Sequence, residues 1–148
     1  MIRPAQFEDL QALIPLTKAE FDECLGGSGF EWREEEIKDS LIEFSMTDDH
    51  VLLVARVGEK VVGYLGGVIT PWMHNKRQML AIETGWYVIP EYRGRTVGIR
   101  LWRAWEKWVV LHNASLIYCA SPQANPTVGF MLMKMGYMPL ETYYVKEP

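Results

Sequence analysis

Residues 87–108 have the sequence YVIPEYRGRTVGIRLWRAWEKW, which predicts a strand, a turn and a helix in direct succession. The apolar run before Pro90 is typical of a strand, and Pro90 ends it because proline lacks a backbone N–H. From Gly98 onward, apolar residues recur at helical spacing. The first N–H groups of a helix lack intrahelical partners, and the helix dipole adds partial positive charge there. The stretch therefore predicts an anion-binding site where this helix begins.

Four residues of the turn favour a phosphate ligand. Gly94 and Gly98 have no Cβ atom that would hold a phosphate away from the backbone. Arg93 and Arg95 bring formal positive charge to the same place. The sequence lacks G-x-x-x-x-G-K-[ST], and it lacks a G-x-G-x-x-G followed by an acidic residue about 20 positions later. Neither a nucleoside triphosphate nor a dinucleotide is therefore favoured.

The segment Arg93-Gly-Arg-Thr-Val-Gly98 resembles the acyl-coenzyme A loop of the GNAT superfamily of N-acetyltransferases. In that loop Arg or Gln is followed by two residues, Gly, one residue, and Gly or Ala. Thr96 departs from the pattern because it stands where the family usually has its first Gly, although its hydroxyl can donate to a phosphate oxygen. The resemblance implies acetyl-CoA as the cofactor. It assigns cofactor contacts to the strand end, the turn, the helix start and one residue further on: Tyr87, Val88, Ile89, Arg93, Gly94, Arg95, Thr96, Val97, Gly98, Ile99 and Asn125.

The whole chain predicts the order β-α-α-β-β-β-α-β-α-β. We expect an α/β fold with one mixed, largely antiparallel sheet and helices on both faces, and this order resembles the GNAT fold from end to end. Pro15 is expected to kink or break the first helix, and Gly58-Glu59 to form a tight hairpin turn. The expected strands are 2–5, 51–57, 60–70, 78–89, 116–120 and 137–146, of which 116–120 is expected to be buried. The expected helices are 7–24, 31–46, 98–112 and 127–135. Residues 71–77 are expected to form a loop.

Length and composition predict one domain spanning residues 1–148. A chain of this length buries roughly two-thirds of its unfolded surface. The composition is 49% hydrophobic and 23% charged, and no apolar run approaches the length of about 20 residues that a membrane span requires. Cys24 and Cys119 lie far apart, and neither has a second cysteine nearby. These features favour a cytoplasmic protein without a metal site and without membrane contact, and they are compatible with a homodimer.

The charges are unevenly distributed along the chain. Residues 1–50 hold 13 acidic and 4 basic side chains, whereas residues 51–148 hold 6 acidic and 11 basic ones. This asymmetry is consistent with a cleft that binds a polyanionic cofactor on one side and an amine, small or protein-borne, on the other. Solvated helix faces explain the acidic half alone about equally well.

The helix after the turn carries two distinct sets of side chains. Trp102, Trp105, Val109 and His112 recur at helical spacing and are expected to pack in the core rather than to form an aromatic ligand site. The basic residues of this helix fall on another face. A nucleic-acid partner is not expected, because the chain is acidic overall and the tryptophans do not alternate with the cations.

Glu83 is the most informative carboxylate, because it lies in the middle of an apolar strand where an unpaired carboxylate is costly to bury. In the GNAT family an acidic residue near this position often acts as general base, and an alkylammonium must lose a proton before it can attack a thioester. The resemblance likewise implies that a backbone N–H near Val88 stabilises the oxyanion. The alternative for Glu83 is a structural carboxylate that caps the backbone or pairs with an arginine.

The end of the chain departs from the family at the expected proton donor. The family commonly has a tyrosine that protonates the departing thiolate, and Leu132 stands at the matching position. Tyr137, Tyr143 and Tyr144 are the other candidates, although a thiolate whose pKa is near 8.5 can leave unprotonated.

Three functions are therefore compared. The first is an acetyl-CoA-dependent N-acetyltransferase acting by direct transfer to a primary amine. The second is a non-catalytic acyl-CoA-binding or regulatory module, for which Leu132 and Thr96 are the arguments. The third is an interaction domain whose acidic helices bind a basic partner.

Overall fold

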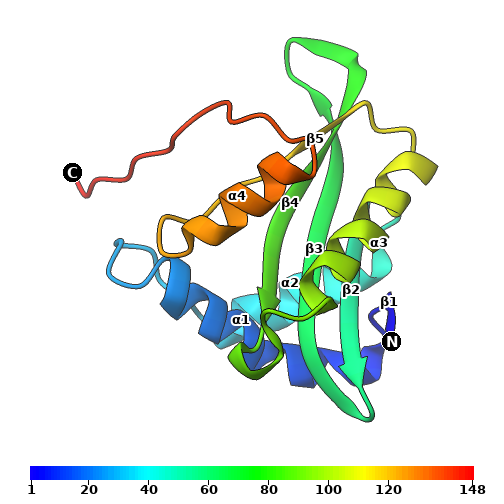
Figure 1. The fold of residues 1–148 in the computed structure, drawn as a ribbon, viewed down its shortest axis with the longest axis vertical. Helices are drawn as coiled ribbons and strands as arrows, with labels where there is room; N and C mark the ends of the chain where they lie inside the picture. Colours follow the sequence, from blue (N-terminus) through cyan, green and yellow to red (C-terminus); the bar gives the residue numbers. More distant parts are fainter.

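One five-stranded sheet organises the computed structural model, which describes residues 1–148 (Figure 1). The strands lie in sequence order, and every neighbouring pair is antiparallel except β4 and β5, which are parallel. The expected mixed, largely antiparallel sheet is therefore confirmed. The strands are β1 (Ile2–Pro4), β2 (His50–Val57), β3 (Lys60–Trp72), β4 (Asn75–Val88) and β5 (Leu116–Tyr118).

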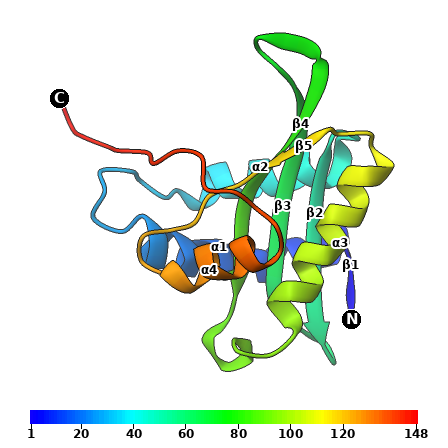
Figure 2. The same cartoon turned by 45° about the horizontal axis from the view of Figure 1, so that its top comes forward.

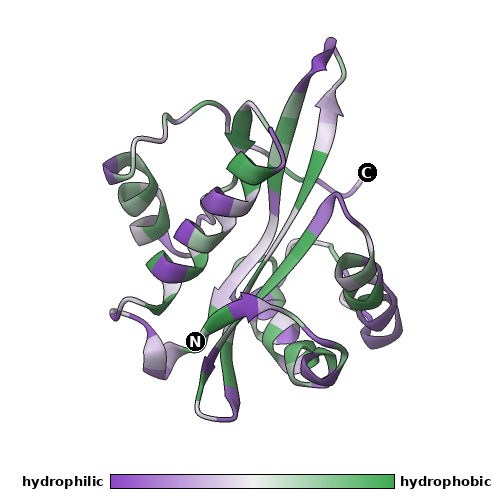
Figure 3. Cartoon of the chain, turned by 90° about the vertical axis from the view of Figure 1, so that its right-hand side faces the viewer, coloured by the Kyte–Doolittle hydropathy of each residue, from purple (hydrophilic) through white to green (hydrophobic).

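Helices cover both faces of this sheet (Figure 3). Strand residues point alternately to opposite faces, so Leu52 and Val54 of β2 pack with α1 and α2, whereas Val51 and Leu53 pack with α3. The helices are α1 (Leu10–Cys24), α2 (Glu34–Met46), α3 (Val97–Leu111) and α4 (Pro126–Lys134), and the short 3-10 helices are η1 (Phe7–Asp9) and η2 (Pro90–Tyr92). None of the α-helices combines the length and the apolar composition that a membrane crossing needs.

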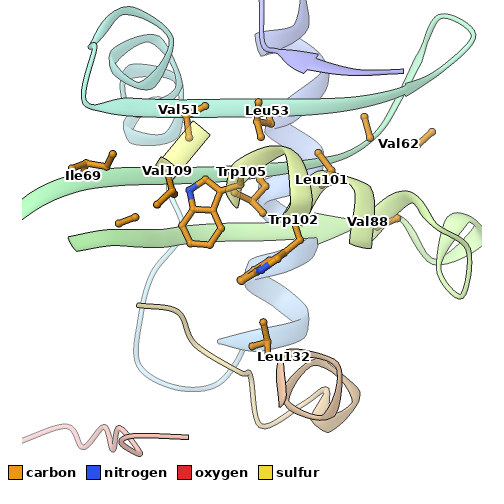
Figure 4. Close-up of a cluster of buried hydrophobic side chains, with 13 residues drawn as sticks. Val51, Leu53, Val62, Ile69, Val88, Leu101, Trp102, Trp105, Val109 and Leu132 are labelled. Atoms are coloured by element: carbon orange, nitrogen blue, oxygen red, sulfur yellow. The ribbon is translucent and has the colours of Figure 1, made fainter. Parts of the chain in front are cut away.

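Tryptophans of α3 form the centre of the larger core (Figure 4). Trp102 and Trp105 are fully buried, with ring centroids 4.9 Å apart, and Trp86 of β4 packs 4.8 Å from Trp102. The expectation that Trp102, Trp105 and Val109 pack in the core is confirmed. His112 instead lies exposed after the last turn of the helix.

Neither a break of the first helix nor the expected loop is present. Helix α1 runs through Pro15 without a break. The expected loop over residues 71–77 is also wrong, because β3 and β4 continue as a hairpin and leave only Met73 and His74 in the turn. Pro71 is accommodated at a register shift, which is one of the few places where a strand tolerates proline.

The two last expected strands also differ from the structure. Strand β5 ends at Tyr118 and is not buried, since Leu116 is 51% exposed on an edge strand that has no outer neighbour. The strand expected over residues 137–146 is absent: residues 138–148 extend from the body as the red segment of Figure 2 and make no backbone hydrogen bonds. Strand-forming side chains do not make a strand unless a neighbouring edge lies beside them.

Gly67→Ala is expected to destabilise the fold by about 1–3 kcal/mol, because a Cβ at Gly67 would lie 2.5 Å from Nε1 of the buried Trp105. Denaturant unfolding measures the loss. In a Trp105→Phe background the same substitution should be less costly, because the smaller ring leaves room for the methyl group. Equal losses in both backgrounds would show that the indole does not set this constraint.

Candidate active site

Strand β4 loses its neighbour on one side halfway along its length. Its parallel pairing with β5 covers only Leu80–Ile82, whereas its antiparallel pairing with β3 continues to Val88. The register with β3 shifts opposite Thr84, as in a β-bulge. From residue 83 to residue 88, the side of β4 that faces away from β3 therefore has no strand partner, and we call this side the open edge.

Two backbone N–H groups point into the open edge. Because the Ile89 N–H donates to Val62 on β3, strand alternation directs the N–H groups of Trp86 and Val88 away from β3. The Trp86 N–H donates to Oε1 of Glu20 at 2.8 Å. No side chain accepts from the Val88 N–H, so the residue expected to stabilise an oxyanion has a free donor at this edge.

Glu83 lies at the start of the open edge and is partly buried. Burial, together with the nearby Glu20 carboxylate, raises the pKa of Glu83 to about 8, against the opposing effect of a hydrogen bond from the backbone of Ala120. A carboxylate with this pKa is a stronger proton acceptor than an ordinary one. The pKa of Glu83 is compatible with a general base, and this role stays a prediction.

Glu20 is a site residue that the sequence analysis did not single out. Its carboxylate accepts hydrogen bonds from the Tyr64 hydroxyl and from the Trp86 N–H. Burial raises the pKa of Glu20, although both hydrogen bonds lower it. The signal was present in the sequence, because Glu20 follows the buried Leu13 and Thr17 at helical spacing and so lies on the inner face of α1.

The start of α3 has the properties of an anion site. The first intrahelical bond of α3 joins the Arg100 N–H to Thr96 O, so the N–H groups of Val97, Gly98 and Ile99 have no helical partner. Thr96 is the N-cap, and its side chain makes no capping hydrogen bond. These free donors fit the phosphates of a nucleotide cofactor.

The two arginines of the turn have different environments. Arg95 is exposed, lies over the Tyr92 ring at 5.5 Å and has no carboxylate partner, so its charge is available to an anion. Arg93 instead forms a bidentate pair with Glu23 of α1 at 3.0 and 2.6 Å and donates from Nε to Val88 O at 2.7 Å. Arg93 therefore ties the turn to α1, and Figure 1 shows the loop between β4 and α3 next to that helix.

The glycines and the strand residues of the expected cofactor site differ in what surrounds them. Gly94 adopts a φ of 71°, which glycine allows at little cost, and nothing lies near its missing side chain. A Cβ at Gly98 would meet the Trp86 ring at 3.1 Å, so Gly98 permits close packing of α3 on β4. The side chains of Tyr87 and Val88 are buried, and Ile89 is partly buried, so these residues present backbone groups to a ligand.

The residues near the C-terminus do not provide an obvious proton donor. Asn125 is the partly buried N-cap of α4. Leu132 is buried in the core. The Tyr137 hydroxyl accepts from Trp102 Nε1 and donates to Glu106, and burial together with that carboxylate raises the pKa of Tyr137 well above its usual range. Tyr143 and Tyr144 are exposed on the extended segment.

A model of the acetyltransferase (GNAT) family matches residues 11–137. Solved structures share the fold. The AAC(6')-Iy complex with the bisubstrate analogue CoA-S-monomethyl-acetylneamine aligns at 15% identity over 100% of this chain and 97% of its own, with a TM-score of 0.81. A ribosomal-protein-alanine N-acetyltransferase from Brucella melitensis biovar Abortus 2308 aligns at 14% identity over 99% of each chain, with a TM-score of 0.74. A transcriptional regulator from Bacillus halodurans C-125 aligns at 20% identity over 97% of this chain and 99% of its own, with a TM-score of 0.77. No curated protein sequence matches the chain.

Glu83→Gln is expected to flatten the pH dependence of stability. The pKa of Glu83 is about 8 in the folded protein against 4.5 for a free side chain, so the folded state retains a proton that the unfolded state has released. The stabilisation that this carboxyl provides is complete below about pH 4.5 and disappears as the pH rises through about 8. Thermal melts between these limits should show the wild type losing stability relative to Glu83→Gln. The exposed Glu36→Gln is the matched control, and parallel curves for Glu83→Gln and wild type would contradict the expectation.

Proposed function

The chain belongs to the acetyltransferase (GNAT) family, and on that basis we propose that it transfers an acetyl group from acetyl-CoA to a primary amine by direct attack. One observation carries this proposal: β4 presents the Glu83 carboxylate and the free Val88 N–H, then leads through one turn to the free N–H groups of α3. A base, an oxyanion donor and a phosphate site are thus joined by one continuous segment. Acetyl-CoA supplies the acyl group as a thioester.

The residues divide the work of the reaction. Glu83 accepts a proton from the ammonium of the acceptor, which frees the nitrogen lone pair for attack on the acyl carbon. The Val88 N–H donates to the acyl oxygen as negative charge develops on it. The carbon–sulfur bond then breaks, and the nitrogen releases its second proton to the departing thiolate or to water. No protein acid takes part, since Leu132 has no proton to give and the Tyr137 hydroxyl is hydrogen-bonded to Glu106.

The cofactor site that we propose keeps the expected residues but changes the role of one. The N–H groups of Val97, Gly98 and Ile99 bind the phosphates together with Arg95, and the backbone of residues 87–89 faces the rest of the cofactor. The Thr96 hydroxyl, which makes no capping hydrogen bond, donates to a phosphate oxygen. Gly94 allows the positive φ angle of the turn, and Asn125 lies at the start of α4. Arg93 acts indirectly, by holding the turn against Glu23.

The acceptor in this proposal is a cation. Glu20 places negative charge at the open edge, Glu83 adds to it as it ionises near pH 8, and α1 and α2 carry further acidic side chains. An alkylammonium, on a small molecule or on a protein, is the complementary group. The free cysteines favour a cytoplasmic setting, and the single domain over residues 1–148 and the homodimer stay predictions.

A second candidate function is a non-catalytic acyl-CoA-binding module. The position of Leu132 in the core favours it, because no proton donor takes the place of the family's tyrosine. The two functions differ in one measurement: a panel of amines should release free thiol from acetyl-CoA only if the protein turns over.

Glu83→Gln is expected to lower kcat/KM most at neutral pH. In the wild type the rate should rise as the carboxylate ionises, with an inflection near pH 8 in the free protein. The variant should become active only as the amine itself loses its proton near pH 10, so the two profiles should converge there. A fully stable variant with an unchanged profile would remove Glu83 from the mechanism.

Arg95→Ala and Arg93→Ala should have different effects. Arg95→Ala should weaken CoA about tenfold while leaving an acetyl-pantetheine thioester unaffected, because only CoA carries the nucleotide phosphates. Arg93→Ala should lower the melting temperature, because it leaves Glu23 unpaired and Val88 O without its donor. Calorimetric titration and thermal melts measure these effects, and equal losses of both ligands with Arg95→Ala would contradict the phosphate assignment.

A further inference from the structure

Glu20 reaches from α1 to the open edge and occupies part of it. Its Oε1 accepts from the Trp86 N–H at 2.8 Å, and its Oε2 accepts from the Tyr64 hydroxyl. The Trp86 N–H points to the same side of β4 as the free Val88 N–H, and the two donors are about 7 Å apart along the strand. One of the two donors of the open edge is therefore free, and the other is held by a carboxylate.

An acyl-CoA ligand needs donors of this kind. Its pantetheine arm carries amide carbonyls, and its thioester carries one further carbonyl. A ligand that lies along β4 pairs these oxygens with outward N–H groups, as an added strand would. A single N–H cannot serve both the Glu20 carboxylate and a ligand carbonyl in good geometry.

We propose that Glu20 is a displaceable gate on the acyl site: its carboxylate holds the Trp86 N–H in the free protein, and the thioester oxygen takes that N–H when acetyl-CoA binds. This proposal rests on the function proposed above. It moves the acyl oxygen, and the oxyanion that forms from it, from the Val88 N–H to the Trp86 N–H, because two donors about 7 Å apart cannot share one oxygen. The Val88 N–H is then left for an amide carbonyl of the pantetheine arm. Glu20 is a positioning residue in this scheme, since it acts through the donor that it releases.

The charges around Glu20 make its release feasible. Glu23 on α1 repels its negative charge, as does Glu83 on β4 once it ionises, and burial disfavours that charge, while Tyr64 of β3 and the Trp86 N–H stabilise it. Cys24 on α1 and Cys119 after β5 lie in the same region and are uncharged near neutral pH, because burial raises the pKa of both thiols. Arg93, a cation of the same region, is paired with Glu23. Strong hydrogen bonds and unfavourable charge therefore oppose one another at this side chain.

The gate predicts a specific difference between two ligands. Acetyl-CoA has the thioester oxygen that competes with Glu20, and CoA does not. Removing the carboxylate should therefore favour acetyl-CoA over CoA, because the acyl oxygen then gains a donor without displacing an ion. We expect Glu20→Ala to raise the ratio of the CoA dissociation constant to the acetyl-CoA dissociation constant about tenfold, the size of one hydrogen bond to a charged group.

Calorimetric titration of both ligands into wild type, Glu20→Ala and Tyr64→Phe tests this expectation. Tyr64→Phe removes one partner of the gate and keeps the carboxylate, so it should raise the same ratio by a smaller factor, and it keeps the proposal testable where Glu20→Ala does not fold. Asp22→Asn is the control, because Asp22 lies on the same helix, is exposed and pairs only with Lys18. The control ratio should equal that of the wild type. The amide resonance of Trp86 in the ligand-free protein provides an independent readout and should shift in Glu20→Ala and not in Asp22→Asn.

The outcomes separate the gate from the function on which it rests. If Glu20→Ala weakens both ligands equally, leaves the ratio of the two dissociation constants unchanged and lowers the melting temperature, Glu20 only stabilises the fold, and the gate is overturned. An unshifted Trp86 amide would overturn it as well. If neither ligand binds the wild type or the control, the cofactor assignment itself is wrong, and the gate falls with it.

Discussion

Beyond Ile82, β4 has a strand neighbour on one side only, and the backbone groups left without partners determine how the site is built. A buried N–H or C=O that makes no hydrogen bond costs free energy, so each of these groups needs another partner. The protein supplies two of them: Glu20 accepts from Trp86, and Arg93 donates to Val88 O. The Val88 N–H is left for a ligand. The missing strand neighbour thus explains the positions of the Glu20 carboxylate and the Arg93 guanidinium, and it leaves the donor on which the proposed acyl site depends.

The tryptophan core holds this open edge in place from the other side. Trp86 lies on β4 and packs against Trp102, which in turn contacts Trp105 and the Tyr137 ring. Gly98 allows α3 to approach the Trp86 ring, so the helix with the free N-terminal N–H groups is packed directly on the strand with the open edge. The relative position of the two parts of the proposed cofactor site is therefore set by aromatic packing, which is rigid because interiors are close-packed.

Local sequence signals predicted the elements of the fold well and the partners of the site less well. The helical spacing of Trp102, Trp105 and Val109 and the glycine-rich turn after β4 each identify a feature that depends on near neighbours in the sequence. The pairing of Arg93 with Glu23 joins residues that are 70 positions apart, and no local pattern encodes it. The segment after Gly136 has strand-like composition and remains unpaired, because a strand requires an edge that the sequence of the segment does not specify. Glu83 could be predicted because a carboxylate in an apolar strand is conspicuous. Glu20 could be predicted only by following the buried face of α1 one turn beyond Thr17.

The bond between Arg93 and Glu23 has an evolutionary consequence. It joins α1, which borders the proposed acceptor side, to the turn that begins the proposed cofactor side. A substitution at Glu23 that adapted the protein to a new amine would therefore also loosen the turn. Changes of acceptor are therefore epistatic with cofactor affinity when they fall at this position. They are independent of it when they fall on the exposed face of α2, whose side chains make no hydrogen bond to the turn. Divergence toward new acceptors should accumulate first on α2, while the last turn of α1 changes only together with the residue at position 93.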